Sequence, residues 1–313
     1  QDQVNRIFSR MTTHEVYNGH AEVAVSGGSV LAYASVVDNG SNDPTTIPAK
    51  PLAGGQSLIP MMNFRLAQPA VIVDLNRIHA LSYIQPTRDG GIRVGAMTRQ
   101  NQVERDPLVA KAAPMIHAAM PKIAYPQIRS RGTFGGSIAH ADPSAELVAA
   151  SVALEGQFVL RSPRGERQIA AQDFFVGLFT TVLEPDELLI EARLPPMPRR
   201  SGWAFHEVAR RHHDFALAGV AARVTLDRRG LCEQCRLAFF SVGDGPVQGL
   251  QASAALQGQE PTEAAIAEAA TIAGDADVDP QSDINASAEY RRHLVKVLSR
   301  RALTEAVERA QGG

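Results

Sequence analysis

Short apolar runs separated by turn residues predict a chain of mixed α+β structure. Residues 71–75, 92–95 and 188–194 are rich in valine, isoleucine and leucine, a composition typical of buried strands. Residues 158–160 and 167–169 flank a Ser-Pro-Arg-Gly turn, which predicts a β-hairpin. The hydrophobic pattern therefore places several short strands in the middle of the chain.

Helix signals lie between and after these strands. Asp106 before Pro107 is typical of a helix start, because the carboxylate caps free amides and proline suits the first turn. Thr262 and Gly274 are typical of the start and the end of a second helix. A third helix is predicted over residues 288–310, where leucine and alanine form one stripe.

The C-terminal third is predicted to be a small antiparallel sheet with helices on one side. Its apolar runs 217–226 and 235–242 are joined by a turn at 227–230, so we expect them to pair. A double proline at 195–196, followed by paired arginines, marks a boundary before it. The predicted units are an atypical N-terminal segment (1–50), a first domain (51–198) and a C-terminal domain (199–313).

Residues 1–50 differ in character from the rest of the chain. Residues 21–25 and 30–37 have the pattern of two strands divided by adjacent glycines, and 38–44 is rich in turn residues. This segment predicts a β-hairpin followed by a linker.

Composition narrows the class of function. The 313 residues are 44% hydrophobic, enough for more than one core. A formal charge of −2 and an aromatic content of 5% favour neither a nucleic-acid surface nor an acidic-membrane surface. No stretch reaches the about 18 consecutive apolar residues of a membrane span, and the first residues do not resemble a secretion signal. We therefore expect a cytoplasmic chain with small-molecule or protein partners.

Cys232 and Cys235 are the only cysteines in the chain. Two thiols are too few for a disulfide framework, a four-cysteine iron–sulfur cluster or a structural zinc site. Because they lie three residues apart in a predicted strand, we expect their side chains to point to opposite faces. Ordinary strand cysteines are favoured over a redox pair.

The first candidate for chemistry is a glycine loop, Ala53-Gly54-Gly55-Gln56-Ser57. Adjacent glycines let the backbone approach a ligand without an obstructing Cβ. Successive amides in such a turn can face phosphate oxygens, and the serine adds a hydroxyl donor. Alone the motif is weak, because paired glycines are common in tight turns.

A second loop, Thr133-Phe134-Gly135-Gly136-Ser137, repeats the same design. Asp142, Ser144 or Glu146, which follow it, can supply the polar partner that a ribose needs. The spacing fits neither the Rossmann fingerprint nor a P-loop. Two loops of this kind favour a dinucleotide held in a different way.

These motifs resemble the FAD-binding medium subunit of molybdenum hydroxylases, the family containing xanthine dehydrogenase and carbon monoxide dehydrogenase. The resemblance is carried by residues 52–63, 128–143, 287–294 and 300–303, and it extends over residues 51–310. It implies a two-part FAD-binding region of the vanillyl-alcohol-oxidase (PCMH) type, followed by a C-terminal α+β domain. The segment 1–50 departs from the family pattern, which leads into the first loop through a helix.

The resemblance also implies which residues contact FAD. Both glycine loops would line the pyrophosphate, Ile123 would pack against the cofactor, and Glu146 would bind its ribose end. Leu189 would contact the adenine or the ring region. His206 would lie near the isoalloxazine ring, where the family often has lysine. The full expected set is Leu52, Ala53, Gly54, Gly55, Gln56, Ser57, Leu58, Ile123, Thr133, Phe134, Gly135, Gly136, Ser137, Asp142, Glu146, Leu189 and His206.

The function implied by the resemblance is electron transfer. FAD in this chain would accept electrons from [2Fe–2S] clusters of a small partner subunit and pass them to an external acceptor. A large partner subunit would hold the molybdenum cofactor, giving a heterotrimer or a dimer of heterotrimers. We expect neither a catalytic side chain nor a metal site in this chain. Two alternatives remain: a self-sufficient FAD-dependent oxidase, and a non-catalytic binding module whose glycine turns are only structural.

Overall fold

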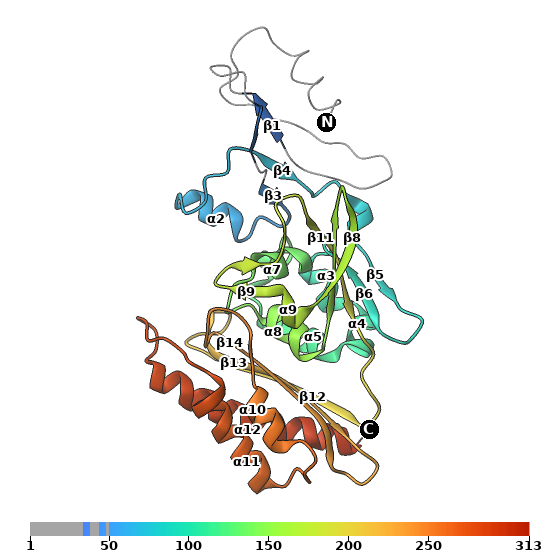
Figure 1. Cartoon of the computed structure of the whole chain (residues 1–313), viewed down its shortest axis with the longest axis vertical. Helices are drawn as coiled ribbons and strands as arrows, with labels where there is room; N and C mark the ends of the chain where they lie inside the picture. The colour runs from blue at the N-terminus through green and yellow to red at the C-terminus, as the bar shows by residue number, and fades with distance from the viewer. Residues whose placement is uncertain (1–33, 38–43, 48–49, 313) are drawn as a thin grey trace.

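The computed structural model describes residues 34–37, 44–47 and 50–312. They form two parts stacked along the long axis, with the C-terminal helices at one end (Figure 1). Residues 21–25, predicted as a strand, lie outside the described residues. The predicted strand at 30–37 is represented by β1 (Ala34–Val37), which pairs antiparallel with β2 (Pro44–Ile47).

The first part is built on a five-stranded antiparallel sheet of order β5-β6-β11-β7-β8. The predicted hairpin and the three predicted strands of this region are confirmed. The predicted strand at 71–75 does not join this sheet, because it forms β4 of a separate two-stranded sheet with β3. The bounds are β3 (Lys50–Leu52), β4 (Ile72–Asp74), β5 (Ile84–Pro86), β6 (Ile92–Gly95), β7 (Gln157–Ser162), β8 (Gly165–Ala170) and β11 (Leu188–Leu194).

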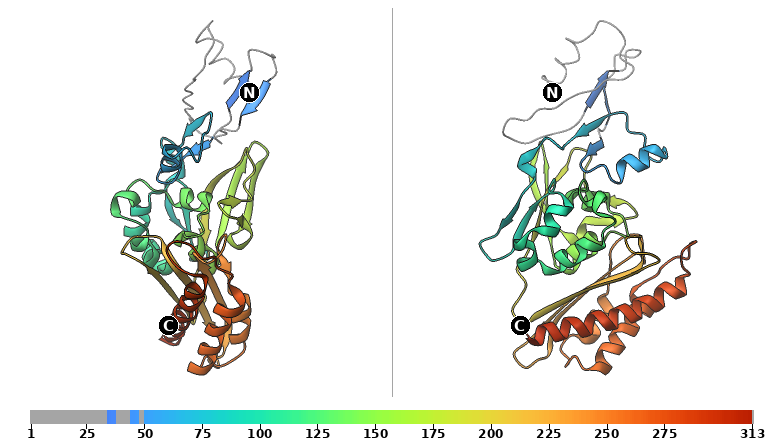
Figure 2. Two further views of the ribbon diagram at one scale, coloured as in Figure 1. Left: turned by 90° about the vertical axis from the view of Figure 1, so that its left-hand side faces the viewer. Right: turned by 180° about the vertical axis from the view of Figure 1, so that it is seen from behind.

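Short helices cover the inner face of this sheet and share one core with it (Figure 2). The predicted cap at Asp106 is confirmed, because its carboxylate accepts hydrogen bonds from the amides of Leu108 and Val109. The remaining elements are α2 (Leu58–Asn63), η1 (His79–Leu81), α3 (Gln100–Arg105), α4 (Pro107–Ala112), α5 (Pro114–Ala119), η2 (Met120–Lys122), α6 (Pro126–Arg129), α7 (Phe134–His140), α8 (Glu146–Ala153), α9 (Ala171–Phe174), β9 (Phe175–Gly177) and β10 (Thr180–Thr181).

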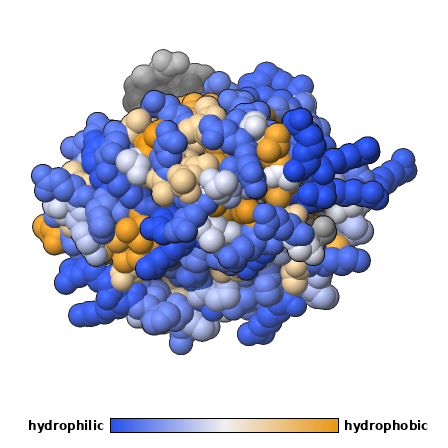
Figure 3. Space-filling model, turned by 90° about the horizontal axis from the view of Figure 1, so that it is seen from below, coloured by the Kyte–Doolittle hydropathy of each residue, from blue (hydrophilic) through white to orange (hydrophobic). Residues whose placement is uncertain are grey.

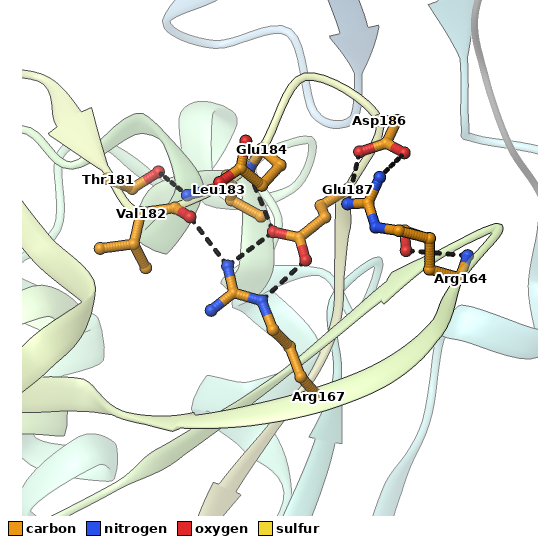
Figure 4. A network of polar contacts seen from close by, with 9 residues as sticks. Arg164, Arg167, Thr181, Val182, Leu183, Glu184, Asp186 and Glu187 are labelled. Atoms are coloured by element: carbon orange, nitrogen blue, oxygen red, sulfur yellow. Dashed lines mark hydrogen bonds and ion pairs between the residues drawn. The ribbon is translucent and has the colours of Figure 1, made fainter.

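A polar network ties the β7–β8 hairpin to the segment that leads into β11 (Figure 4). Arg167 donates two hydrogen bonds of 2.7 Å to the carboxylate of Glu187. Arg164 binds Asp186 in the same two-pronged way. The Glu187 side chain is buried, and its hydrogen bond with Arg167 lowers the pKa of that carboxyl. The network therefore fixes the start of β11.

The second part is a four-stranded antiparallel sheet of order β12-β13-β14-β15, and one of its faces carries the helices, as predicted. Pairing of β13 with β14 is confirmed. Thr262 caps its helix as predicted, but the helix continues past Ile272 into a π-helical turn. The bounds are β12 (Ser201–Ala209), β13 (Ala216–Leu226), β14 (Cys232–Phe240), β15 (Val247–Gln248), α10 (Leu250–Leu256), α11 (Glu263–Ile272), η3 (Ala273–Asp277) and α12 (Ala288–Gly312).

The two cysteines do not point to opposite faces, so that prediction is wrong. The register shifts near the start of β14, and Cys232 and Cys235 pair with Leu226 and Val224 of β13. These partners are two residues apart and share a face. An extra residue, a β-bulge, resets the alternation, so both thiols are buried in the core beneath the helices.

The opposite face of the second sheet packs against α5 and α8 of the first part. Phe205 and Phe240 stack with ring centroids 5.3 Å apart and join the core of the first part. Glu155, at the end of α8, accepts hydrogen bonds from Arg223 and Arg236 of the second sheet. We call this contact between α5, η2 and α8 on one side and β12–β14 on the other the seam.

The outer surface of the second part is mixed in character. On the face seen from below, hydrophobic residues lie in separate groups among hydrophilic ones (Figure 3). In the part of the chain that the structure describes, none of the helices has the length and apolar character needed to cross a membrane.

Candidate functional site

The two glycine loops are in direct contact. A Cβ atom on Gly54 would lie 2.4 Å from the carbonyl oxygen of Arg131 and 2.8 Å from the Cα of Gly132. A Cβ on Gly136 would lie 3.5 Å from the Cβ of Ala53. Only a glycine at position 54 permits this approach of backbone to backbone. The structure therefore brings together the two motifs that the sequence places 80 residues apart, at 53–57 and 133–137.

The second loop is bonded to the protein interior. Thr133 caps α7, and its hydroxyl accepts a hydrogen bond of 3.1 Å from the amide of Gly136. The amides of Phe134 and Gly135 donate to the carbonyls of Thr98 and Ala96, next to β6. Phe134 and Gly135 are buried. The amides of Phe134, Gly135 and Gly136 are therefore used in hydrogen bonds within the protein, and this loop supports the first loop.

The first loop keeps its donors available. Within the described residues, the amides of residues 55–58 have no hydrogen-bond acceptor, and the hydroxyl of Ser57 has none either. Gly55 adopts a φ of 75°, a left-handed conformation that favours glycine. Successive free amides beside such a turn form a concave donor surface suited to phosphate oxygens. The residues present thus fit a pyrophosphate, and Leu52 and Leu58 bracket the turn at the end of β3 and the start of α2.

A cleft of about 1140 Å³ opens between the two parts of the molecule, and the described residues that line it lie outside both glycine loops. Its first wall is formed by Ile123, Asp142, Ser144 and Glu146. The opposite wall includes Arg210, His213, Phe215 and Ser241 of the second part. Three residues expected to contact a dinucleotide, Ile123, Asp142 and Glu146, therefore share one wall.

Acidic groups dominate one end of that wall. Burial, together with the nearby carboxylates of Glu207 and Asp142, raises the pKa of Glu146 to about 8. Burial also raises the pKa of Glu207 to about 7, although Lys122, 3.9 Å away, opposes this effect. The carboxylate of Asp142 accepts a hydrogen bond of 2.8 Å from the amide of Ser144.

Known FAD-binding subunits match this chain over most of its length. Residues 34–197 match the FAD binding domain in molybdopterin dehydrogenase, and residues 203–306 match the C-terminal domain of CO dehydrogenase flavoprotein. The chain is 41% identical to the nicotine 6-hydroxylase medium subunit of Paenarthrobacter nicotinovorans, with 87% of this chain and 95% of the relative covered. It is 37% identical to the carbon monoxide dehydrogenase medium chain of Hydrogenophaga pseudoflava, with 82% and 89% covered.

The chain belongs to the FAD-binding medium subunits of the molybdenum hydroxylase family. A solved structure of the carbon monoxide dehydrogenase from Hydrogenophaga pseudoflava, which lacks the Mo-pyranopterin moiety of its cofactor, superimposes with a TM-score of 0.80 at 38% identity. That alignment covers 84% of this chain and 90% of the other. The family resemblance and FAD as the cofactor are confirmed. Mixed helix and sheet structure is confirmed, whereas the vanillyl-alcohol-oxidase subdivision stays a prediction.

Leu189 lies between the loops and the core of this medium subunit. It belongs to β11, which contacts α7, the helix whose first turn is the second loop. Leu189 is buried, and it packs in the same core as Ile123 and Phe134. Leu189 therefore packs in the core behind the second loop, and little of its own surface is exposed.

The structure does not bring His206 together with the other expected site residues. Side chains alternate along β12, and a Cβ on Gly202 would meet α12, so the even-numbered positions face that helix. The ring Nε2 of His206 accordingly lies 2.7 Å from the carboxylate of Glu305 on α12. Glu207, the next residue, faces the first part of the molecule instead.

Two arginines that support the site were missed in the sequence. Arg129 is 5% exposed, binds Glu104 with two hydrogen bonds, and donates to the carbonyls of Ile123 and Ala124. Arg99 donates to the carbonyl of Arg131, the same carbonyl that Gly54 approaches. A single sequence gives no signal for either role, because each arginine has a partner far along the chain: Glu104 for Arg129 and the carbonyl of Arg131 for Arg99.

Proposed function

We propose that this subunit binds FAD between its two parts and uses it to move electrons between proteins. FAD would accept electrons from [2Fe–2S] clusters of a small partner subunit and deliver them to an external acceptor. A large partner subunit would oxidise the organic substrate at its molybdenum cofactor. The assembly would be a heterotrimer or a dimer of heterotrimers.

The observation that carries this proposal is the contact between the two glycine loops. In the first loop, the amides of residues 55–58 have no acceptor among the described residues, and the first loop packs against the second. Such a set of available amides suits the oxygens of a pyrophosphate. FAD supplies the redox chemistry when bound, and the protein binds, orients and tunes it. We assign the amides of residues 55–58 to the pyrophosphate, and the wall of Ile123, Asp142 and Glu146 to the rest of the cofactor.

The need for partners is supported by the composition of the chain and by the names of its relatives. Both cysteines are buried in the second core, so they are too few and too enclosed to ligate iron–sulfur clusters. The relatives are named as medium subunits or medium chains, and one as subunit alpha of a 6-hydroxypseudooxynicotine dehydrogenase complex. Electrons would therefore reach this flavin from another chain.

Two of the expected contacts are less well supported by the geometry. His206 faces α12 and binds Glu305, so placing it at the isoalloxazine ring requires a rearrangement of β12 or a ligand reaching around the strand. Leu189 would contact FAD only through the small part of its surface that is not covered. We therefore rest the proposal on the loops and the cleft wall.

The first experiment is FAD uptake by the purified chain. We expect flavin absorbance in the isolated protein, or tight uptake of added FAD with quenching of its fluorescence. A Gly54→Val variant should lose uptake, because its larger side chain forces the loops apart. Failure of the unaltered, folded chain to take up FAD would overturn the proposal.

The second experiment tests the electron-transfer role. The chain is co-expressed with candidate partner subunits, and flavin reduction is followed after substrate addition. We expect reduction only when the molybdenum and iron–sulfur subunits are present. A monomer that oxidises an organic substrate alone would instead favour the self-sufficient oxidase.

A further inference from the structure

Arg99 lies where the two glycine loops meet. Its guanidinium donates a hydrogen bond to the carbonyl of Arg131, whose oxygen would lie 2.4 Å from a Cβ on Gly54. A second nitrogen of the same guanidinium donates a hydrogen bond of 2.6 Å to the side-chain oxygen of Asn76. One side chain therefore binds both the segment before the second loop and the segment after β4.

The backbone around Arg99 is fixed to the second loop. Residue 99 forms an antiparallel bridge with Thr133, the first residue of that loop. The amide of Gln100 donates a hydrogen bond of 2.9 Å to the carbonyl of Gly132. Because these contacts use main-chain groups, they do not depend on the side chain at position 99. The guanidinium of Arg99 therefore extends from a backbone that a substitution there leaves in place.

Asn76 connects Arg99 to the first loop through β4. The carboxylate of Asp74 accepts hydrogen bonds from the amide and from the side-chain nitrogen of Asn76. Asp74 ends β4, and the parallel partner β3 ends at Leu52, directly before the first loop. The amide of Leu75 donates a further hydrogen bond of 2.9 Å to the carbonyl of Leu52. A short run of hydrogen bonds thus leads from Arg99 to the residue before the first loop.

The apolar contacts that hold this part of the chain are few. In a small cluster, Val73 and Leu75 of the β4 segment pack with Met97, Leu188 and Ile190. Among residues 50–70, which the structure describes without gaps, only Gly54 is buried. The apolar core therefore holds the first loop weakly, and the polar link through Arg99 has a large share in its placement.

We propose that Arg99 is a positioning residue for FAD, which aligns the amides of the first loop with the second loop by binding Asn76 and the Arg131 carbonyl at once. This inference rests on the proposed function, in which the amides of residues 55–58 bind the pyrophosphate. Arginine suits the role, because its planar guanidinium presents several donors in a fixed fork. Lysine carries one ammonium group on a flexible stem and lacks this geometry.

The test is an FAD titration of the full chain and of two variants at position 99, followed by flavin fluorescence. Arg99→Met keeps the apolar stem and removes both guanidinium hydrogen bonds. We expect its FAD affinity to fall by about tenfold or more, as loss of a hydrogen bond to a charged group does. Arg99→Lys should lose nearly as much. Full affinity in either variant would overturn the inference, and in Arg99→Lys it would show that only the positive charge matters.

Asn76→Ala removes the other end of the link. We expect a smaller loss of FAD affinity, because the bond from Arg99 to the Arg131 carbonyl remains. Arg99→Met combined with Asn76→Ala should lose clearly less binding free energy than the sum of the two single losses, since either change breaks the same bond. Additive losses would show two unrelated contributions and would contradict the proposed link.

The matched control is Arg161→Met, which removes an arginine of β7 that pairs with Glu166 on β8. It should leave FAD affinity unchanged, and an equal loss there would show that overall charge is responsible and would overturn the inference. Urea unfolding is measured for every variant. If Arg99→Met and Asn76→Ala lower the free energy of unfolding but leave the FAD affinity of the folded chain unchanged, the arginine is merely structural. Absence of FAD binding by the unaltered chain would instead overturn the proposed function.

Discussion

The two glycine loops share a sequence pattern but differ in how their backbones are used. In the second loop, the amides of Phe134, Gly135 and Gly136 are bonded within the protein, and the chain is buried against β6. In the first loop the amides of residues 55–58 find no acceptor in the described part of the chain, and the helix that follows has no buried residue. One loop is a support and the other is a donor surface.

Because of this difference, we expect the second loop to matter mainly for the stability of the fold and the first loop mainly for FAD binding. A change in the second loop must disturb the core, because the core is what that loop contacts. A change in the first loop mainly alters its contact with the second, because little else holds it. Substitutions at equivalent glycines should therefore have different consequences for unfolding and for FAD affinity.

The largest effect on stability is expected from Gly135→Ala. Its Cβ would lie 2.4 Å from the Cβ and 2.7 Å from the Cα of Ala96, so β6 and α7 must separate. Overpacking of this kind costs about 1–3 kcal/mol, more than the about 1 kcal/mol that alanine gains over glycine in a helix. We expect a lower free energy of unfolding in urea. Gly177→Ala, whose Cβ meets nothing within 4 Å, is the control and should leave stability nearly unchanged.

Gly54→Ala should affect binding more than stability. Its Cβ would lie 2.4 Å from the carbonyl oxygen of Arg131, and the first loop can relieve this clash by moving into solvent. We expect FAD affinity to fall by about tenfold or more, since the amides lose their alignment and each tenfold is 1.4 kcal/mol. Titration with FAD and urea unfolding measure the two effects. A drop in stability as large as that of Gly135→Ala would contradict the division of roles.

Local sequence signals predicted much of this molecule. Strands β6, β7, β8 and β11 of the five-stranded sheet, the cap at Asp106, the pairing of β13 with β14 and the long C-terminal helix all follow from residues close together in the chain. Strand β5 was not predicted. The two glycine motifs were also visible as motifs. Their contact was not, because it depends on the approach of Gly54 to a carbonyl 77 positions away, at residue 131.

Strand faces were the least predictable feature. Both faces of β12 are covered, one by α12 and one by the first part, so no polar–apolar alternation shows which residues enter the site. For this reason the sequence did not show that His206 faces α12 and that Glu207 faces the first part of the molecule. At Cys232 and Cys235 a single extra residue reset the alternation, and a bulge leaves no clear mark in the sequence. The division of the chain at residues 198 and 199 stays a prediction.

The smallest effect is expected from Thr133→Val, which removes the hydroxyl that accepts the amide hydrogen bond of Gly136 and keeps the shape of the side chain. Loss of such a helix cap costs about 1 kcal/mol. Because the amide of Gly136 then becomes free at the junction of the two loops, we expect stability to fall while FAD affinity changes by less than about threefold, which is less than 1 kcal/mol. Parallel urea and FAD titrations measure the pair of values. A loss of affinity as large as that of Gly54→Ala, without loss of stability, would show that the second loop also contacts the cofactor directly and would remove the contrast between the loops.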